Sequence, residues 1–267
     1  MSPVKQDGQP RAVTGRAFEV LDTFDARHRR QSLAQITRRS GLPLTTAHRL
    51  VRELERNDAL VRRNDGAYEI GSKLWRLGLL ASVHSDLREI ALPYMEDVYQ
   101  LGNGAVQIAV LDGLRCLIVE RIAGSRTLQT LSRPGERLPL HATGVGKVLL
   151  ANGSDELRDA VLGSLERYTQ STITDATTLT QQLRTIRAQG FAQTGEELSP
   201  GATSIAVPIR GNGNRVIAAL GCVCPADSGM TANMLPVLQV TASALGKQLV
   251  ARGLGEATAL HSNAERS

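Results

Sequence analysis

The stretch SLAQITRRSGLPLTTAHRLVRELER, residues 32–56, decides the fold of the N-terminal part of the chain. Ser32 and Gln35 have the spacing of a capping box, in which each side chain binds a free backbone N–H of the other residue at a helix start. Gly41 ends this helix because glycine takes the left-handed conformation of a helix C-terminus without strain. Pro43 is expected at the first position of a second helix, which continues to about Asn57. The stretch predicts two short helices joined by a tight turn.

Elements on either side complete a small domain. Apolar residues at helical spacing predict a helix from about residue 16, before the capping box. Residues 60–62 and 67–70 flank Asn64-Asp65-Gly66 and predict a hairpin, because Asp-Gly readily supplies the positive φ angles of a tight turn. Three helices and a hairpin wing are typical of a helix-turn-helix whose second helix enters the major groove of DNA.

The helix of residues 44–57 has an apolar face and a polar, mostly basic face. Arginine forms bidentate bonds with guanine or binds phosphate, threonine binds bases or phosphates, and leucine packs on a thymine methyl group. Arginines in the wing are placed to reach the DNA backbone. The candidate DNA-binding residues are Leu44, Thr45, Thr46, His48, Arg49, Arg52, Arg62 and Arg63.

Charge is distributed unevenly along the chain. Residues 1–81 contain 15 Lys and Arg against 9 Asp and Glu, a net charge of +6, whereas the other residues contain 16 against 17, a net charge of −1. A basic segment joined to a near-neutral remainder suggests that the N-terminal part binds a polyanion. The alternative is a solvated basic face without a partner.

Length and composition limit the class of protein. A chain of 267 residues with 42% hydrophobic residues suggests two globular domains. No apolar run approaches the roughly 18 residues of a membrane-spanning helix, and three cysteines are too few for a disulfide framework. The interpretation is a cytoplasmic protein without a membrane partner.

The C-terminal part alternates hairpins and helices. Hairpins are expected at residues 105–121 and 203–223, and a further strand at residues 127–131. Helices are expected at residues 144–151, 154–165, 178–189 and 231–252. This alternation indicates an antiparallel α+β domain.

Motifs typical of enzymes are incomplete in this sequence. Gly146-Lys147 fails as a phosphate-binding loop because His141 stands where that motif has glycine and Val148 where it has Ser or Thr. The cysteines lack the spacing of a zinc site. His141 with Glu196-Glu197 remains conceivable as a hydrolytic set, but an anchoring histidine is favoured. No catalytic residue, metal ligand or cofactor is assigned.

Motifs along residues 14–250 resemble the IclR family of bacterial transcription regulators. The resemblance is carried by Leu33-Ala34-Gln35-Ile36, Ser40-Gly41-Leu42-Pro43, Thr45-Thr46-Ala47-His48-Arg49-Leu50, Tyr68-Glu69-Ile70-Gly71, His141-Ala142-Thr143-Gly144-Val145-Gly146-Lys147, Glu196-Glu197, Ile205-Ala206-Val207-Pro208 and Cys224-Pro225. The motifs after Lys147 look like the family's last sheet strands. The resemblance implies an N-terminal winged helix-turn-helix and a C-terminal GAF-like, antiparallel-sheet effector domain.

The resemblance also implies a small-molecule pocket between the sheet and the helix after Thr143. The residues that it would use are Thr130, Leu138, Gly144, Val145, Ser204, Ala206, Gly221 and Val223. Independently, a helix N-terminus at residues 144–146 offers free N–H groups and a positive dipole end to a carboxylate. The alternative is that the glycines only allow close packing of helix on sheet.

The pocket departs from the family pattern. Gly221 and Val223 replace hydroxyl residues of relatives that bind small polar oxo-acids, and Thr194 stands where an acidic residue can occur. We therefore expect a roomier, less polar pocket, and an effector such as an aromatic carboxylate.

The sequence predicts a ligand-responsive regulator, not an enzyme, which represses a catabolic operon by binding double-stranded operator DNA as a homodimer or a tetramer made of two dimers. The expected parts are a tail (1–13), the DNA-binding domain (14–71), a linker helix (72–86), the effector domain (87–252) and a second tail (253–267). The alternative is a small-molecule hydrolase or transferase with a DNA-binding appendage; turnover of a ligand would distinguish the two.

Overall fold

A computed structural model describes residues 13–25, 28–80, 85–102, 104–124, 132–229 and 231–256. The chain divides into two compact units, residues 1–82 and 83–267. The expected strand at residues 127–131, with Thr130, lies outside the described residues, as do residues 1–12 and 257–267 of the expected tails.

The first unit begins with three helices, α1 (Val13–Leu21), α2 (Leu33–Ser40) and α3 (Leu44–Arg56). The predicted capping box opens α2: Ser32 Oγ accepts from the backbone N–H of Gln35 at 3.3 Å, and Gln35 Oε1 accepts from that of Ser32 at 2.8 Å. Gly41 follows α2 with φ +67°. Pro43 is the N-cap of α3 and not its first residue, because its ψ of 142° is extended.

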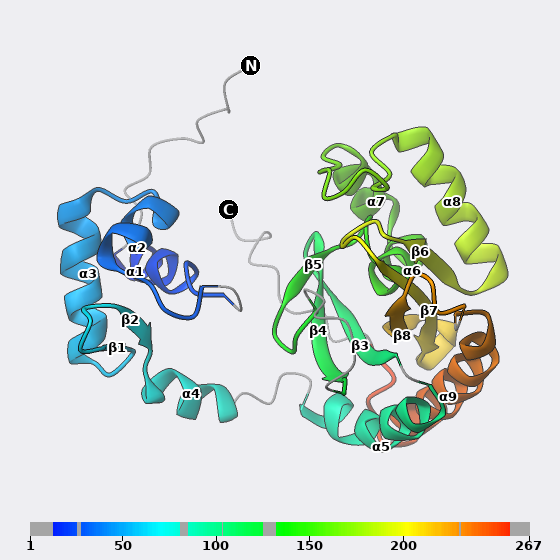
Figure 1. The fold of residues 1–267 in the computed structure, drawn as a ribbon. Helices are drawn as coiled ribbons and strands as arrows, with labels where there is room; N and C mark the ends of the chain where they lie inside the picture. Colours follow the sequence, from blue (N-terminus) through cyan, green and yellow to red (C-terminus); the bar gives the residue numbers. More distant parts are fainter. Residues whose placement is uncertain are drawn as a thin grey trace. The chain divides into compact units, whose positions relative to one another are not determined.

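The wing consists of two antiparallel strands, β1 (Leu60–Arg62) and β2 (Tyr68–Ile70). Gly66 takes φ +81° in the turn between them. A short helix, α4 (Ser72–Leu79), follows the wing (Figure 1). The core of the unit joins helices and wing and consists of Val20, Ile36, Leu50, Val51, Leu60 and Tyr68. The three helices and the wing predicted from the sequence are confirmed.

The second unit is built on one six-stranded antiparallel sheet with the order β5-β4-β3-β8-β7-β6. Its strands are β3 (Ala105–Asp112), β4 (Arg115–Ile122), β5 (Arg137–Pro139), β6 (Ala192–Gly195), β7 (Ala202–Arg210) and β8 (Val216–Pro225). The long helices α5 (Ser85–Leu101) and α9 (Thr231–Ala251) cover one face, and α6 (Gly144–Asn152), α7 (Asp155–Leu162) and α8 (Ala176–Gln189) lie on the other (Figure 1). The expected α+β class is confirmed.

Side-chain size differs between the two faces of the sheet. The face toward α5 and α9 carries large apolar residues such as Ile108, Ile205 and Leu220. The face toward α6 carries the small residues Ala109, Ala192, Ala206 and Ala219. Strand side chains alternate between faces, so a regular alternation of large and small residues lets a helix approach one face closely. Residues 144–151 of α6 are all buried as a result.

Two short edge strands, β5 and β6, were not predicted. Three or four residues are too few for alternation to be recognised in the sequence. Glu196-Glu197 was expected to belong to the last strands of the sheet. That interpretation is wrong: both residues follow β6 in a turn, where Glu196 has φ +55°.

Candidate DNA-binding surface and effector pocket

The exposed face of α3 carries the residues predicted to contact DNA. Leu44, at the first position of the helix, is 58% exposed although it is apolar. Thr45, His48, Arg49 and Arg52 are exposed as well, and Thr46 is half-buried. Because Ala47, Leu50 and Val51 hold the opposite face in the core, these polar side chains point away from the domain.

Two arginines of α3 have unpaired charges. Within the described part of the chain, no carboxylate lies within 4 Å of the guanidinium of Arg49 or Arg52, whereas Arg56 is 3.5 Å from Glu53. Arg39 of α2 also forms an ion pair, with its Nη2 2.7 Å from Asp25 Oδ2. Arg49 and Arg52 are therefore available to bind an anionic partner.

The two wing arginines differ from each other. Arg62 lies over the ring of Tyr68, 5.9 Å from its centroid, and no ion pair of Arg62 is found among the described residues. Arg63 binds Glu69 Oε2 through Nη2 at 2.5 Å, and this hydrogen bond raises the pKa of Arg63. The sequence predicts that both arginines contact the DNA backbone. In the structure Arg63 has an ionic partner, whereas Arg62 has none among the described residues.

A small pocket lies in the second unit beside the N-terminus of α6. It encloses about 40 Å³. Its lining residues are Gln107, Ser132, Leu138, Ala142, Thr143, Thr194, Glu197, Leu198, Ser199, Ala202, Thr203, Ser204 and Val223. These come from five strands, from the residues just before α6, from the loop after β6 and from Ser132, so the sheet topology brings together residues more than 100 positions apart.

The predicted effector residues divide into two groups. Leu138, Ser204 and Val223 line the pocket. Gly144, Val145, Ala206 and Gly221 are not among the lining residues and lie where α6 packs closely on the sheet: a Cβ atom at position 144 would lie 2.7 Å from Ser204 Oγ, and one at position 221 would lie 2.9 Å from Val145 Cγ1.

The glycine at position 221 does not add space to the pocket. Val145 occupies the space beside Gly221, so the absence of a side chain at Gly221 accommodates the helix and leaves no room for a ligand. Most of the lining side chains are also polar. Gly146 serves packing too, because a Cβ atom there would lie 2.7 Å from Leu140 Cα.

The first turn of α6 presents hydrogen-bond donors. Thr143 caps the helix: its Oγ1 accepts from the N–H of Gly146 at 3.1 Å and donates to the carbonyl of Pro139 at 2.9 Å. The N–H groups of Gly144 and Val145 have no acceptor among the residues that the structure describes. Free N–H groups and the positive end of the helix dipole favour an anion at this position.

A buried ion pair lies next to the pocket. Lys147 Nζ is 2.6 Å from each carboxylate oxygen of Glu197, and it donates to Gln182 Oε1 at 2.7 Å. Burial lowers the pKa of Lys147, while the charge of Glu197 opposes that shift. Since the two charges neutralise each other, the pair adds little net field to the pocket. Binding of an anion in the pocket therefore depends on backbone N–H groups.

His141 is structural. Its Nε2 lies 2.9 Å from the carbonyl oxygen of Glu166, and burial lowers its pKa. Glu197 is held by Lys147, and Glu196 Oε2 accepts from the N–H of Gly201 at 2.7 Å. The three residues have separate partners, which favours the anchoring role over the hydrolytic set.

The cysteines offer no reactive thiolate in the pocket. Burial raises the pKa of Cys116 to about 11. Cys222 and Cys224 are buried on the opposite face of the sheet, with their sulfur atoms 3.5 Å apart. In the described residues, no group of three or more His, Cys, Asp or Glu side chains is placed to hold a metal ion.

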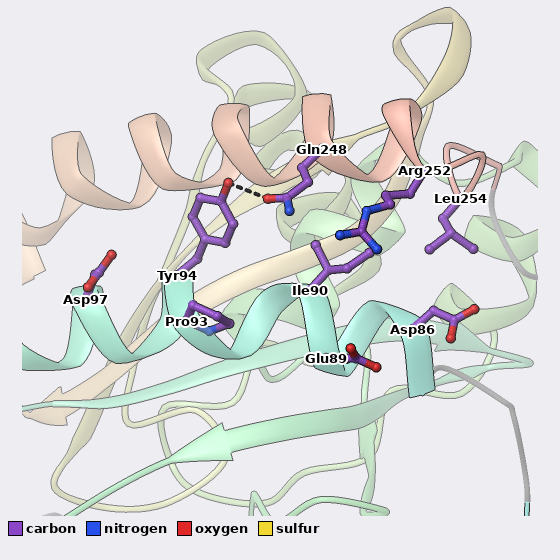
Figure 2. Close-up of a pocket in the computed structure, with 9 residues that line it drawn as sticks. All are labelled: Asp86, Glu89, Ile90, Pro93, Tyr94, Asp97, Gln248, Arg252 and Leu254. Atoms are coloured by element: carbon purple, nitrogen blue, oxygen red, sulfur yellow. Dashed lines mark hydrogen bonds between the residues drawn. The ribbon is translucent and has the colours of Figure 1, made fainter.

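A larger groove of about 660 Å³ runs between α5 and α9 (Figure 2). Tyr94 Oη donates to Gln248 Oε1 across it at 2.5 Å. Asp86, Glu89 and Asp97 line the α5 side against a single cation, Arg252 of the α9 side, so the net negative charge of the lining disfavours an acid. It contains none of the predicted effector residues and is open to solvent. The smaller pocket is therefore the better candidate for an acidic effector.

Two pocket residues were missed as ligand candidates. Glu197 was considered only for hydrolysis. Gln107 was not noticed, although a polar residue in the middle of the apolar strand AVQIAVL was a usable signal, since buried polar residues usually have a specific partner.

The helix-turn-helix with an exposed basic helix, followed by a sheet domain with a small polar pocket, defines a DNA-binding regulator with a ligand-binding domain. Two family models match the chain: "IclR helix-turn-helix domain" over residues 13–64 and "Bacterial transcriptional regulator IclR C-terminal" over residues 80–247. The chain belongs to the IclR family of transcriptional regulators.

Individual relatives agree with this assignment. The HTH-type transcriptional regulator XynR of Escherichia coli (strain K12) is 30% identical over 240 residues, which are 88% of this chain and 95% of XynR. The HTH-type transcriptional repressor AllR of the same strain is 28% identical over 228 residues, 84% of this chain and 83% of AllR. These relatives are named as regulators of transcription and not as enzymes.

One solved structure is similar along its whole length. It is an IclR homolog from Microbacterium hydrocarbonoxydans complexed with 4-hydroxybenzoate, 35% identical, with a TM-score of 0.80 over 90% of this chain and 100% of that chain. In the described ranges of the present chain, no helix has the length and apolarity to cross a membrane.

Proposed function

We propose that this protein represses transcription by binding operator DNA through α3 and Arg62 of the wing, and that a small carboxylic acid in the pocket beside α6 changes its DNA affinity. The DNA-binding part of the proposal rests on Arg49 and Arg52, which lie on an exposed helix face and have no ionic partner among the described residues. The free N–H groups of Gly144 and Val145 carry the ligand part. The repressor name of AllR supports the sign of regulation.

An aromatic acid is the ligand that we favour, because the IclR homolog from Microbacterium hydrocarbonoxydans was solved in complex with 4-hydroxybenzoate. The pocket has a volume of about 40 Å³, far less than the roughly 300–1,000 Å³ of ordinary small-molecule sites. Such a ligand has to move the side chains that line the pocket. A ligand that requires an opened pocket binds two arrangements of the domain unequally, which is the condition for changing DNA affinity.

We further propose the domain limits given above and a homodimer formed through α4. Trp75 is 64% exposed, Leu77 is exposed on the same short helix, and Leu80, directly after the helix, is exposed too. Three exposed large apolar side chains so close together are typical of a protein interface. A dimer would present two α3 helices to half-sites about one DNA turn apart.

Fluorescence anisotropy of labelled upstream DNA, with and without candidate acids, tests the proposal. We expect tight binding that one or more acids weaken. Operator DNA must then change the affinity for the acid by the same factor. Turnover of the bound acid by the purified protein would favour the hydrolase or transferase alternative.

A further inference from the structure

Gln107 is a buried polar residue at the centre of the sheet. It lies on β3, opposite Gly221 of β8 and Arg121 of β4, and only 3% of it is exposed. Residues directly opposite each other in antiparallel strands share one face of the sheet. Gln107 therefore lies on the face that α6 covers, and its side chain lines the effector pocket.

The amide oxygen of Gln107 lacks a partner. Oε1 is buried and accepts no hydrogen bond from the described residues. Buried polar atoms are nearly always paired, because an unpaired atom has lost its bonds to water without replacement. An unpaired acceptor in a ligand pocket therefore needs a donor that the described part of the chain does not provide.

None of the described neighbouring side chains donates a hydrogen bond to Oε1. Gly221 has no side chain, and Val223 is apolar. The hydroxyl groups of Thr194 and Ser204 lie 2.6 Å apart and bind each other. Thr203 Oγ1 donates to the carbonyl oxygen of Thr194 at 2.8 Å. Each of these three hydroxyl groups takes part in a hydrogen bond within the sheet, whereas Gln107 lines the pocket with an amide oxygen that has no partner among the described residues.

We propose that Gln107 Oε1 accepts a hydrogen bond from a hydroxyl or N–H group of the effector, so that the effector is an acid carrying a separate donor. This inference rests on the proposed function, because it takes the pocket beside α6 as the effector site. An amide oxygen only accepts, and an ionised carboxylate has no proton to donate. The acid group and Gln107 therefore meet different ends of the ligand. Gly144 and Val145 supply donors to the acid, and Gln107 supplies the acceptor.

This arrangement makes Gln107 a specificity residue. An analogue without the donor leaves Oε1 unpaired in the complex, which costs affinity. Leucine at position 107 removes the unpaired atom, so the Gln107→Leu protein without ligand should be as stable as the wild type or more stable. A merely structural glutamine would give the opposite result, because its replacement would break a bond within the fold.

The experiment uses the full-length protein and two probes of similar size, 4-hydroxybenzoate and 4-methylbenzoate. Isothermal titration should show that the wild type binds the hydroxy acid at least about tenfold more tightly, as expected for one buried hydrogen bond. Gln107→Leu should bind the two acids within about threefold of each other. Thr203→Val is the matched control: it removes a paired hydroxyl group of the same pocket and should lower the Tm of the ligand-free protein, whereas Gln107→Leu should not.

The inference is overturned if the wild type shows no preference, if Gln107→Leu keeps the preference, or if its Tm falls as far as that of Thr203→Val. The uncharged probes 4-hydroxybenzamide and 4-methylbenzamide separate this inference from the proposed function. If only the amides bind, with a hydroxyl preference that Gln107→Leu abolishes, the carboxylate part of the proposed function fails and the role of Gln107 stands. If none of the four probes binds, both fail.

Discussion

Lys147 Nζ lies 2.6 Å from both carboxylate oxygens of Glu197, and the two side chains are 0% and 5% exposed. Lys147 belongs to α6, whose first turn presents the free N–H groups, and Glu197 lines the pocket after β6. The ion pair therefore fixes the donor end of the pocket relative to its opposite wall. It does so without leaving a net charge that would attract or repel an acid.

Lys147→Met should lower the free energy of unfolding by about 3–5 kcal/mol, because it leaves the carboxylate of Glu197 buried without a counter-charge. The double variant Lys147→Met/Glu197→Leu removes both charges and should recover much of that loss. Urea denaturation of the three proteins checks this. A single variant within about 1 kcal/mol of the wild type would show that water reaches the pair.

Arg49→Ala and Arg52→Ala should each weaken operator binding. An arginine that reads guanine should contribute about 1–3 kcal/mol and specificity at that base, whereas one that binds phosphate should weaken all sequences similarly. Arg56→Ala is the control on the same helix, because Arg56 is already paired with Glu53. If the Arg49→Ala and Arg52→Ala proteins both shifted operator DNA in gels as the wild type does, α3 would be excluded as the recognition helix.

The two wing arginines should differ in salt dependence. Arg62→Ala should reduce the slope of log affinity against log salt by about 0.9, the contribution of one phosphate contact. Arg63→Ala should change the slope less, since Glu69 already binds its guanidinium. Anisotropy titrations at several salt concentrations measure both slopes, and equal effects would contradict the assignment.

Lowering the pH should destabilise the second unit through protonation of His141. Burial places the pKa of His141 below the 6.5 of an ordinary histidine. Between that lowered pKa and 6.5 the unfolded state binds more protons, so the free energy of unfolding falls as the pH falls through this window. His141→Gln keeps an N–H donor for Glu166 but does not titrate, and should show a smaller fall. Denaturant unfolding between pH 7.5 and 5 measures the difference.

Leu77→Glu should loosen the proposed dimer or uncouple ligand from DNA. Leu77 is 54% exposed on α4, and Leu114, in the turn between β3 and β4, has the same exposure. Leu114→Glu is therefore a matched control that should leave assembly unchanged. Sedimentation velocity together with DNA titration decides the matter: unchanged assembly and unchanged coupling in Leu77→Glu would mean that α4 is only a spacer.

The sequence by itself determined the local structure. The capping box at Ser32, the left-handed Gly41, the Asp65-Gly66 turn and the apolar stripe of α3 depend on neighbours within a few residues, so they could be recognised without the tertiary fold. The same holds for the hairpin of β3 and β4. Which side chains α3 exposes was predicted because helical periodicity alone assigns them to a face.

Only the tertiary structure decided the chemistry of the pocket. Pairing of β3 with β8 places Gln107 opposite Gly221, and the close approach of α6 fills the space at Gly221 with Val145. Pairing across the wing likewise commits Arg63 to Glu69 and leaves Arg62 uncommitted. The pocket contacts join residues distant in sequence, and even across the short wing hairpin no local pattern records which polar group finds a partner and which is left for a ligand.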